Sequence, residues 1–227
     1  MKIKKALLLS PPAFTLKNNF DINPLPALGL AYIGAVLENM GIETRIYDSL
    51  VEGWEKIEEV KPGIVRVGAG FEDIEQQIVD FCPDIVGVNN LFTKQRVNAH
   101  RIYDIAKKVN PNIVTIVGGA HPTVMPELVM EDNNVDYIIM GEGENTIRDL
   151  IEYLEGKKKI SELNGIAFRY NGVVKIIPKT SFVDNLDDIP FPARHLLNLN
   201  KYFGLKISHG RRKHKFFSPI ITSRGCP

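Results

Sequence analysis

Short apolar segments alternate with longer amphipathic segments through the first two thirds of the chain, and this alternation restricts the fold more than any other feature. Apolar runs of strand length cover residues 3–9, 42–47, 84–88, 113–117 and 135–139. Apolar residues recur at helical spacing over residues 26–40, 49–60, 71–81, 94–108, 123–131 and 144–155. Strands that alternate with helices in this way predict a parallel sheet covered by helices on both faces.

Right-handed crossovers leave few topologies for such a chain. We expect an α/β, flavodoxin-like (Rossmann-like) fold whose five-stranded parallel sheet has the order 2-1-3-4-5. In that order a ligand crevice forms at the carboxyl ends of the first and third strands. Residues 64–67 are expected to form a short extra element. Asn171-Gly172 predicts a β-hairpin after the sheet, and the proline-rich residues 184–195 predict a linker.

The distribution of charge changes sharply near residue 188. All acidic residues lie at or before Asp188, whereas residues 189–227 hold eight basic residues and none that is acidic. We therefore expect an α/β domain over 1–160, a hairpin and linker over 161–195, and a separate region over 196–227. A nucleic-acid-binding tail is disfavoured, because the basic residues are few and no recognised nucleic-acid motif accompanies them.

Composition and missing motifs exclude several classes of protein. Hydrophobic residues make up 44% and charged residues 24%, which argues against disorder. No apolar run approaches the ~20 residues of a membrane span, and the N-terminal run is too short for a signal peptide. Two cysteines provide neither a disulfide framework nor a zinc site, so we expect a cytoplasmic protein with Cys82 in the core. The motifs of P-loop NTPases and α/β-hydrolases are missing from the sequence.

The loops after the first and third strands carry candidate binding residues. Residues 10–26 form a long loop with Pro11 and Pro12, which is either a shaped wall or a disordered segment. The third strand is followed by Asn89, Asn90, Leu91, Phe92 and Thr93. Their amides and hydroxyl could bind a polar ligand, or Thr93 could simply cap the next helix.

Paired glycines follow the fourth and fifth strands. The fourth strand runs into Gly118, Gly119, His121, Pro122 and Thr123, and the fifth into Gly141, Glu142, Gly143 and Glu144. Glycine at a strand end lets a ligand or another backbone approach closely. His121 is either a hydrogen-bonded structural residue or a ligand contact. Glu144 suits a helix start, and Glu142 could accept hydrogen bonds from a ligand.

These loops occur in an order found in a known family. The segments PLPALGLAY (24–32), GGAHPT (118–123) and GEGE (141–144) resemble the cobalamin-binding domain at the N-terminus of cobalamin-dependent radical S-adenosylmethionine enzymes. LDDIPFP (186–192) resembles the connector of that family. TSRGCP (222–227) resembles the first barrel strand and the opening of its Cys-x-x-x-Cys-x-x-Cys motif. The resemblance covers nearly the whole chain.

The resemblance implies that cobalamin lies on the carboxyl ends of the strands, with its nucleotide tail directed toward the sheet. The implied contacts are the loop residues named above together with Leu28 and Gly29. Many cobalamin domains ligate cobalt through a histidine after the first strand, but residues 10–28 contain none. The resemblance therefore implies cobalamin with its own base displaced and no histidine ligand from this loop.

The resemblance also implies the chemistry of a longer enzyme. Cys226 would be the first of three thiolates on a 4Fe-4S cluster that binds S-adenosylmethionine. The expected reaction is methyl transfer, or a related radical rearrangement or cyclisation, on an unknown substrate. The chain would end before the radical barrel, so the fragment would bind cobalamin without turnover. The alternative is a flavodoxin-like module that binds a flavin or a nucleotide without catalysis.

Overall fold

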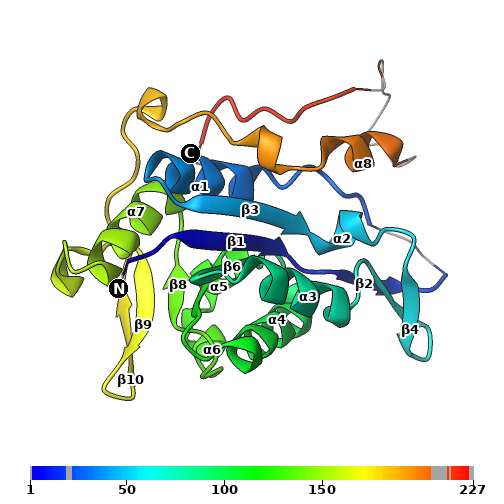
Figure 1. The fold of residues 1–227 in the computed structure, drawn as a ribbon, viewed down its shortest axis with the longest axis horizontal. Coiled ribbons are helices and arrows are strands. Elements are labelled where there is room, and N and C mark those ends of the chain that lie inside the picture. Colours follow the sequence, from blue (N-terminus) through cyan, green and yellow to red (C-terminus); the bar gives the residue numbers. More distant parts are fainter. Residues whose placement is uncertain (1, 19–21, 206–213, 215, 225–227) are drawn as a thin grey trace.

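The computed structural model describes residues 2–18, 22–205, 214 and 216–224. A seven-stranded sheet with the order β10-β9-β8-β7-β6-β1-β3 runs through the molecule (Figure 1). Its parallel part consists of β3 (Glu43–Asp48), β1 (Lys5–Ser10), β6 (Ile85–Asn89), β7 (Val114–Gly118) and β8 (Tyr137–Ile139). Counted along the chain, these strands have the order 2-1-3-4-5. The predicted flavodoxin-like α/β fold is confirmed.

The predicted hairpin is present, but it belongs to the sheet. It consists of β9 (Ile166–Tyr170) and β10 (Val173–Ile177), and β9 pairs antiparallel with β8. The turn residues Asn171 and Gly172 have φ values of +49° and +78°, the left-handed backbone that a two-residue hairpin turn requires. The hairpin therefore covers what would have been an open edge at β8.

Helices cover both faces of the sheet (Figure 1). One face packs against α1 (Leu28–Asn39) and α7 (Gly143–Leu154). The other packs against α3 (Phe71–Phe81), α4 (Arg96–Val109) and α6 (Pro126–Val129). The remaining helical elements are α2 (Ser49–Glu52), α5 (Ala120–Val124), α8 (Leu199–Gly204) and the 3-10 turns Thr93–Gln95, Ile160–Glu162, Leu186–Asp188 and Arg194–Leu196.

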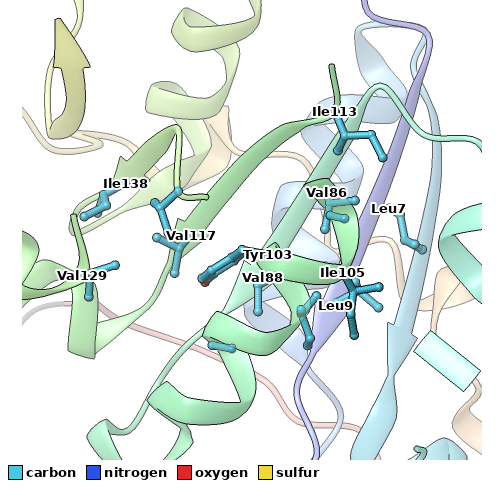
Figure 2. Packing of buried hydrophobic residues seen from close by; sticks show 14 of the residues in the cluster. Leu7, Leu9, Val86, Val88, Tyr103, Ile105, Ile113, Val117, Val129 and Ile138 are labelled. Carbon is cyan, nitrogen blue, oxygen red and sulfur yellow. The ribbon is translucent and has the colours of Figure 1, made fainter. Parts of the chain in front are cut away.

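Alternate residues of each central strand supply the two halves of the core. Leu7 and Leu9 of β1 face the α3 and α4 side, whereas Ala6 and Leu8 face the α1 and α7 side. Figure 2 shows the half of the core that lies between the sheet and α3 and α4. Tyr103 of α4 lies there among the apolar side chains of the strands. Burial on both faces explains why the strands read as continuous apolar runs in the sequence.

The predicted helix over 49–60 is wrong. Helix α2 ends at Glu52, and the chain continues as β4 (Ile57–Lys61), which pairs with β5 (Ile64–Val67). Gly53 follows the helix at a point of close backbone contact. A Cβ at this position would lie 2.1 Å from the backbone nitrogen of Ala69, so a side chain does not fit there. The predicted extra element at 64–67 is therefore the central strand of a second sheet.

The predicted loop over 10–26 also contains a strand. Residues Ala13–Leu16 form β2, which pairs with β5 to complete a three-stranded antiparallel sheet. Ala13 of β2 and Val65 and Val67 of β5 are buried together with Ile22, which lies in the loop after β2. Four residues paired to a distant segment give too short a pattern for recognition from the sequence alone.

Two further expectations differ from the structure. The predicted helix over 123–131 is divided into α5 and α6, because Pro126 has no N–H group and disfavours the helical conformation at Met125. Cys82, expected in the core, is exposed. It ends α3 with a left-handed backbone at φ +49°, and its thiol contacts the carbonyl oxygen of Val79.

Within the described residues, no helix has the length and apolar character needed to cross a membrane.

Candidate functional site

A cavity of about 930 Å³ lies at the carboxyl ends of the parallel strands. Its floor includes Leu8 of β1, Val88 of β6 and Ile116 of β7, and its sides come from residues 23–33, 141–147 and 221–224. The cavity spans the point between β1 and β6 where the chain begins to build the sheet in the opposite direction. Open α/β sheets bind ligands at this switch point. The volume lies at the upper end of the range typical of cofactor pockets, about 300–1,000 Å³.

Eleven of the predicted site residues line this cavity: Leu28, Gly29, Asn89, Leu91, Phe92, Gly118, Gly119, Gly141, Glu142, Gly143 and Glu144. They come from the loops after β6, β7 and β8 and from the first turn of α1. Because the carboxyl ends of parallel strands share one edge of the sheet, the structure brings these distant segments together. The parallel topology alone is sufficient to explain the assembly.

The other predicted residues lie outside the cavity wall: Pro11, Pro12, Asn90, Thr93, His121, Pro122 and Thr123. Most of them make structural contacts behind it. The side chain of Thr93 lies 3.2 Å from Nδ1 of His121, and the carbonyl of Asn90 accepts from the amide of His121. Thr123 donates to the carbonyl of Gly119 and accepts from the amide of Gly141. Cys226 lies outside the described residues.

The glycine pair after β7 shapes the wall in two ways. Gly119 has φ +116°, and a Cβ there would lie 2.6 Å from the carbonyl oxygen of Asn90. Only glycine allows the turn to pass so close to the β6 loop. At Gly118, by contrast, a Cβ would meet only the carbonyl oxygen of Ile139, at 3.8 Å. Gly118 therefore leaves open a space that any side chain would begin to fill.

Asp48 was not predicted as a site residue, although it ends β3 at the same edge of the sheet. Its carboxylate lines the cavity, accepts from the Tyr202 hydroxyl at 2.5 Å and accepts from the Leu50 amide at 3.2 Å. Burial raises the pKa of Asp48 to about 6. Burial and the nearby Asp48 carboxylate raise the pKa of Tyr202 well above its ordinary value. Its place at the carboxyl end of a predicted strand was the sequence feature that could have identified Asp48 as a site residue.

A second polar group lies at the start of α7. Arg224 donates from Nη2 to Oε1 of Glu144 at 2.5 Å, and its Nη1 lies 4.0 Å from Oε1 of Glu142. The hydrogen bond to Glu144 is the largest contribution that raises the pKa of Arg224 above its ordinary value. Both glutamates lie in the first turn or at the cap of α7, where the helix dipole stabilises negative charge. No local sequence pattern indicated that Arg224 reaches this site.

Two buried polar atoms behind the wall have no partner in the described part of the chain, Oδ1 of Asn90 and Nε2 of His121. Burial, with smaller contributions from Arg96 and His100, lowers the pKa of His121, which favours a neutral imidazole. Unpaired polar atoms are costly inside a protein and often indicate a missing water or ligand group. A water or a ligand group beside Gly118 and Gly119 could therefore form hydrogen bonds with these two atoms.

Comparison with known proteins gives one family match and several relatives. Residues 23–151 match the B12 binding domain. The chain is 34% identical over 253 residues to cytidylyl-2-hydroxyethylphosphonate methyltransferase of Streptomyces wedmorensis, covering 99% of the chain and 46% of the relative. It is 31% identical over 228 residues to an uncharacterized methyltransferase of Pyrococcus horikoshii, covering 100% of the chain and 44% of the relative. The chain thus spans less than half the length of these curated relatives.

Solved structures support the fold. The cobalamin-dependent S-adenosylmethionine radical enzyme OxsB, with aqua-cobalamin and S-adenosylmethionine bound, superposes with a TM-score of 0.66 at 23% identity, over 89% of this chain and 26% of OxsB. The radical S-adenosylmethionine methyltransferase TsrM of Kitasatospora setae gives a TM-score of 0.58 at 15% identity, over 78% of this chain and 30% of TsrM. Because the B12 binding domain match extends over more than half of its residues, this chain belongs to the B12-binding domain family.

Proposed function

We propose that this chain binds cobalamin in the cavity at the carboxyl ends of its parallel strands and forms the cobalamin-binding part of a radical S-adenosylmethionine enzyme. One observation supports cobalamin in particular. The cavity is large and lined mainly by apolar side chains and glycines, and its only described cation, Arg224, is already paired with Glu144. Such a wall suits a bulky macrocycle with an apolar face and amide-bearing edges.

The charges of the wall argue against the alternative of a flavin or nucleotide. Phosphate groups are normally held by free helix N-termini or by basic side chains. Here the start of α7 carries Glu142 and Glu144, and Asp48 adds a third carboxyl group on the opposite side. Three acidic groups against one paired arginine disfavour a flavin phosphate or a nucleotide polyphosphate in this cavity.

The residues present fit a corrin ring. Leu25, Leu91 and Phe92 line the cavity and are 49%, 46% and 57% exposed, so apolar surface is available for the face of the ring. Asn89, Asp48 and Glu142 supply polar atoms in the wall for its amide side chains. The seven predicted residues that lie behind the wall would then support the wall or approach the nucleotide tail. They are Pro11, Pro12, Asn90, Thr93, His121, Pro122 and Thr123.

The cobalt would receive no histidine from the described part of the chain. None of the described histidines lines the cavity, and Nδ1 of His121 is engaged with Thr93 behind the wall. This arrangement supports the prediction, made from the missing histidine in residues 10–28, that the nucleotide base is displaced without a protein histidine replacing it.

The activity of the longer protein follows from the same proposal. Cobalamin would supply a transferable methyl group, and Cys226 would be the first ligand of a 4Fe-4S cluster that binds S-adenosylmethionine. Some relatives are named as methyltransferases, and another is the anaerobic magnesium-protoporphyrin IX monomethyl ester cyclase of Rubrivivax gelatinosus. We therefore propose methyl transfer or a related radical cyclisation, with the substrate held by a further domain.

The test is cofactor retention. The chain and the complete protein are incubated anaerobically with hydroxocobalamin, FMN or ATP, then desalted, and the absorbance spectrum is recorded. We expect roughly one corrinoid per chain with a base-off spectrum, and no retained FMN or ATP. A base-on spectrum would contradict the proposed binding mode. Retention of FMN or ATP without cobalamin, by both proteins, would replace the proposal with the flavin or nucleotide module.

A further inference from the structure

The last described residues, 216–224, run at the surface beside α8 and the segment before it, and they end near α1 (Figure 1). Contacts with α8 and with the turn before it hold the start of this terminal segment. The ring of Phe203 on α8 lies 5.2 Å from that of Phe216, edge to face, and Arg194 donates to the carbonyl of Pro219 at 3.0 Å. The segment is thus tied to α8 and to the turn before it rather than to the sheet.

Its far end is held by the cavity wall. The guanidinium of Arg224 is paired with the carboxylate of Glu144, and its Cζ atom lies 5.1 Å from the centre of the Tyr32 ring on α1. The side chains of Arg224 and Glu144 are only 18% and 7% exposed. A buried carboxylate requires a partner, because an unpaired charge there is strongly unfavourable. Removing one member of this pair would therefore loosen the far end of the terminal segment.

The same groups form part of the binding cavity. Ile221, Ser223 and Arg224 of the terminal segment line it, together with Tyr32 and Glu144. A molecule in the cavity would touch both members of the ion pair or their immediate neighbours. The position of the terminal segment and the occupancy of the cavity consequently depend on one set of side chains.

We propose that Arg224 is a positioning residue that couples cobalamin binding to the placement of the terminal segment, an inference that rests on the proposed function. The sequence reaches Cys226, the proposed first cluster ligand, two residues after Arg224. By fixing Arg224 against Glu144, the cavity wall would set the position of the residue that lies two before the proposed cluster ligand in the sequence. Glu144 would thereby influence the placement of the proposed cluster ligand through its ion pair with Arg224.

Coupling of this kind is reciprocal. If a held terminal segment improves cobalamin affinity, bound cobalamin must stabilise the held segment by the same factor. Two measurements on one set of variants therefore test the proposal: amide hydrogen exchange of residues 216–224, with and without hydroxocobalamin, and the dissociation constant for hydroxocobalamin. The complete protein is used for both.

The variants are Arg224→Gln, Arg224→Lys, Glu144→Gln and the double variant. Lys201→Gln is the matched control, because Lys201 also pairs with a carboxylate, Glu52 at 2.5 Å, but does not line the cavity. We expect Arg224→Gln to speed exchange in residues 216–224 on the order of tenfold and to weaken cobalamin binding by a similar factor. Arg224→Lys should restore part of both effects. The double variant should be no worse than the stronger single variant.

Two results would overturn the coupling while leaving the proposed function intact. One is wild-type protein that binds cobalamin while Arg224→Gln changes exchange and affinity no more than Lys201→Gln does. The other is equal protection of residues 216–224 by cobalamin in wild type and in Arg224→Gln. A wild-type protein that retains no cobalamin would instead overturn the proposed function and the coupling with it.

Discussion

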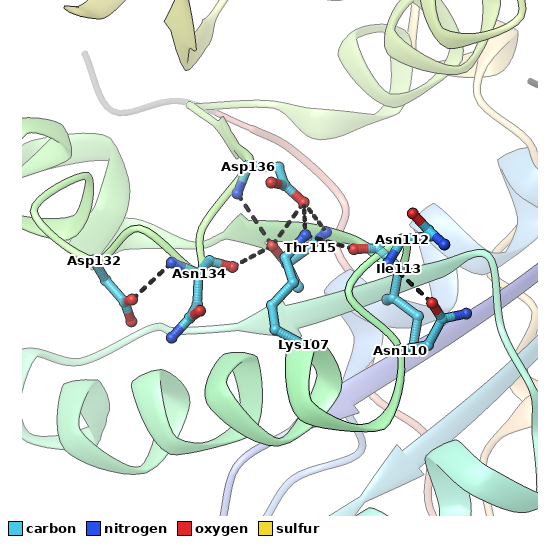
Figure 3. Close-up of polar contacts among 8 residues, drawn as sticks. All are labelled: Lys107, Asn110, Asn112, Ile113, Thr115, Asp132, Asn134 and Asp136. Atoms are coloured by element: carbon cyan, nitrogen blue, oxygen red, sulfur yellow. Dashed lines mark hydrogen bonds and ion pairs between the residues drawn. The ribbon is translucent and has the colours of Figure 1, made fainter. Parts of the chain in front are cut away.

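The amino and carboxyl ends of strands β7 and β8 differ in whether their polar groups have hydrogen-bond partners. At the amino end, Asp136 accepts from the amide of Thr115 at 2.8 Å, from the hydroxyl of Thr115 at 3.1 Å and from Nζ of Lys107 at 2.6 Å. Figure 3 shows this network, in which the Asp136 carboxylate and the Asn134 carbonyl share the single hydroxyl proton of Thr115. Lys107 also donates to the carbonyl of Ile113. The groups at this end satisfy one another.

The carboxyl end of the same strands is built in the opposite way. Gly118 and Gly119 remove side chains where β7 ends, and Oδ1 of Asn90 and Nε2 of His121 lack partners among the described residues. A large apolar cavity opens there instead of a closed polar network. One strand therefore carries a structural end, which stabilises the fold, and an open end, which is available for a ligand.

The largest effect is expected at the structural end. Asp136→Ala removes three hydrogen bonds. It leaves the buried Thr115 amide without its acceptor and the half-buried Lys107 with only the Ile113 carbonyl. We expect the free energy of unfolding to fall by about 4 kcal/mol, with unchanged cobalamin affinity of the folded protein. Urea unfolding and cobalamin titration measure the two quantities. A loss of affinity at unchanged stability would show that the two ends are not separate.

The open end should respond in the reverse manner. Gly118→Phe places a ring in the cavity without a positive φ to strain the backbone. We expect cobalamin affinity to fall roughly 100-fold, since the ring occupies space that the corrin needs, with a small change in stability. Gly204→Leu, at an exposed glycine with open space and outside the cavity, is the control. Unchanged affinity in Gly118→Phe would remove the cavity as the cobalamin site.

Asp48, at the open end, makes the free energy of unfolding depend on pH. Burial raises its pKa from 3.8 to about 6, so the folded protein binds this proton more tightly than the unfolded chain does. Its contribution to stability is therefore present near pH 4 and is lost as pH rises to about 6. Asp48→Asn should be more stable than wild type at pH 7, on the order of 2 kcal/mol, and not at pH 4. Unfolding curves between pH 4 and 7 test this. A difference that does not vary with pH would contradict it.

The smallest effect is expected behind the wall. Thr93→Val removes the contact between the Thr93 hydroxyl and the His121 ring, which lies outside the cavity lining. We expect a loss of about 1 kcal/mol in stability and less than a threefold change in cobalamin affinity. A much larger loss of affinity, seen in the same titrations, would mean that His121 contacts the ligand directly and that the open end extends beyond the cavity described here.

The sequence was sufficient to predict the parallel sheet, because strands buried on both faces are continuous apolar runs and the helices between them have a clear period. It also located the loops that line the cavity, since topology places the carboxyl ends of parallel strands at one edge, and glycine is required where Gly119 passes Asn90. These features depend on local pattern and on simple connection rules.

The remaining features depend on contacts between segments that are far apart in the sequence. The pairing of β2 with β5 joins segments about fifty residues apart, and the hairpin could be seen in the sequence but not its attachment to β8. Burial raises the pKa of Asp48 only in the folded chain, where the hydrogen bond from Tyr202 of α8 opposes that rise. Arg224 reaches Glu144 across eighty residues of sequence. Such contacts depend on burial and distance in space, which residue type and local spacing do not encode.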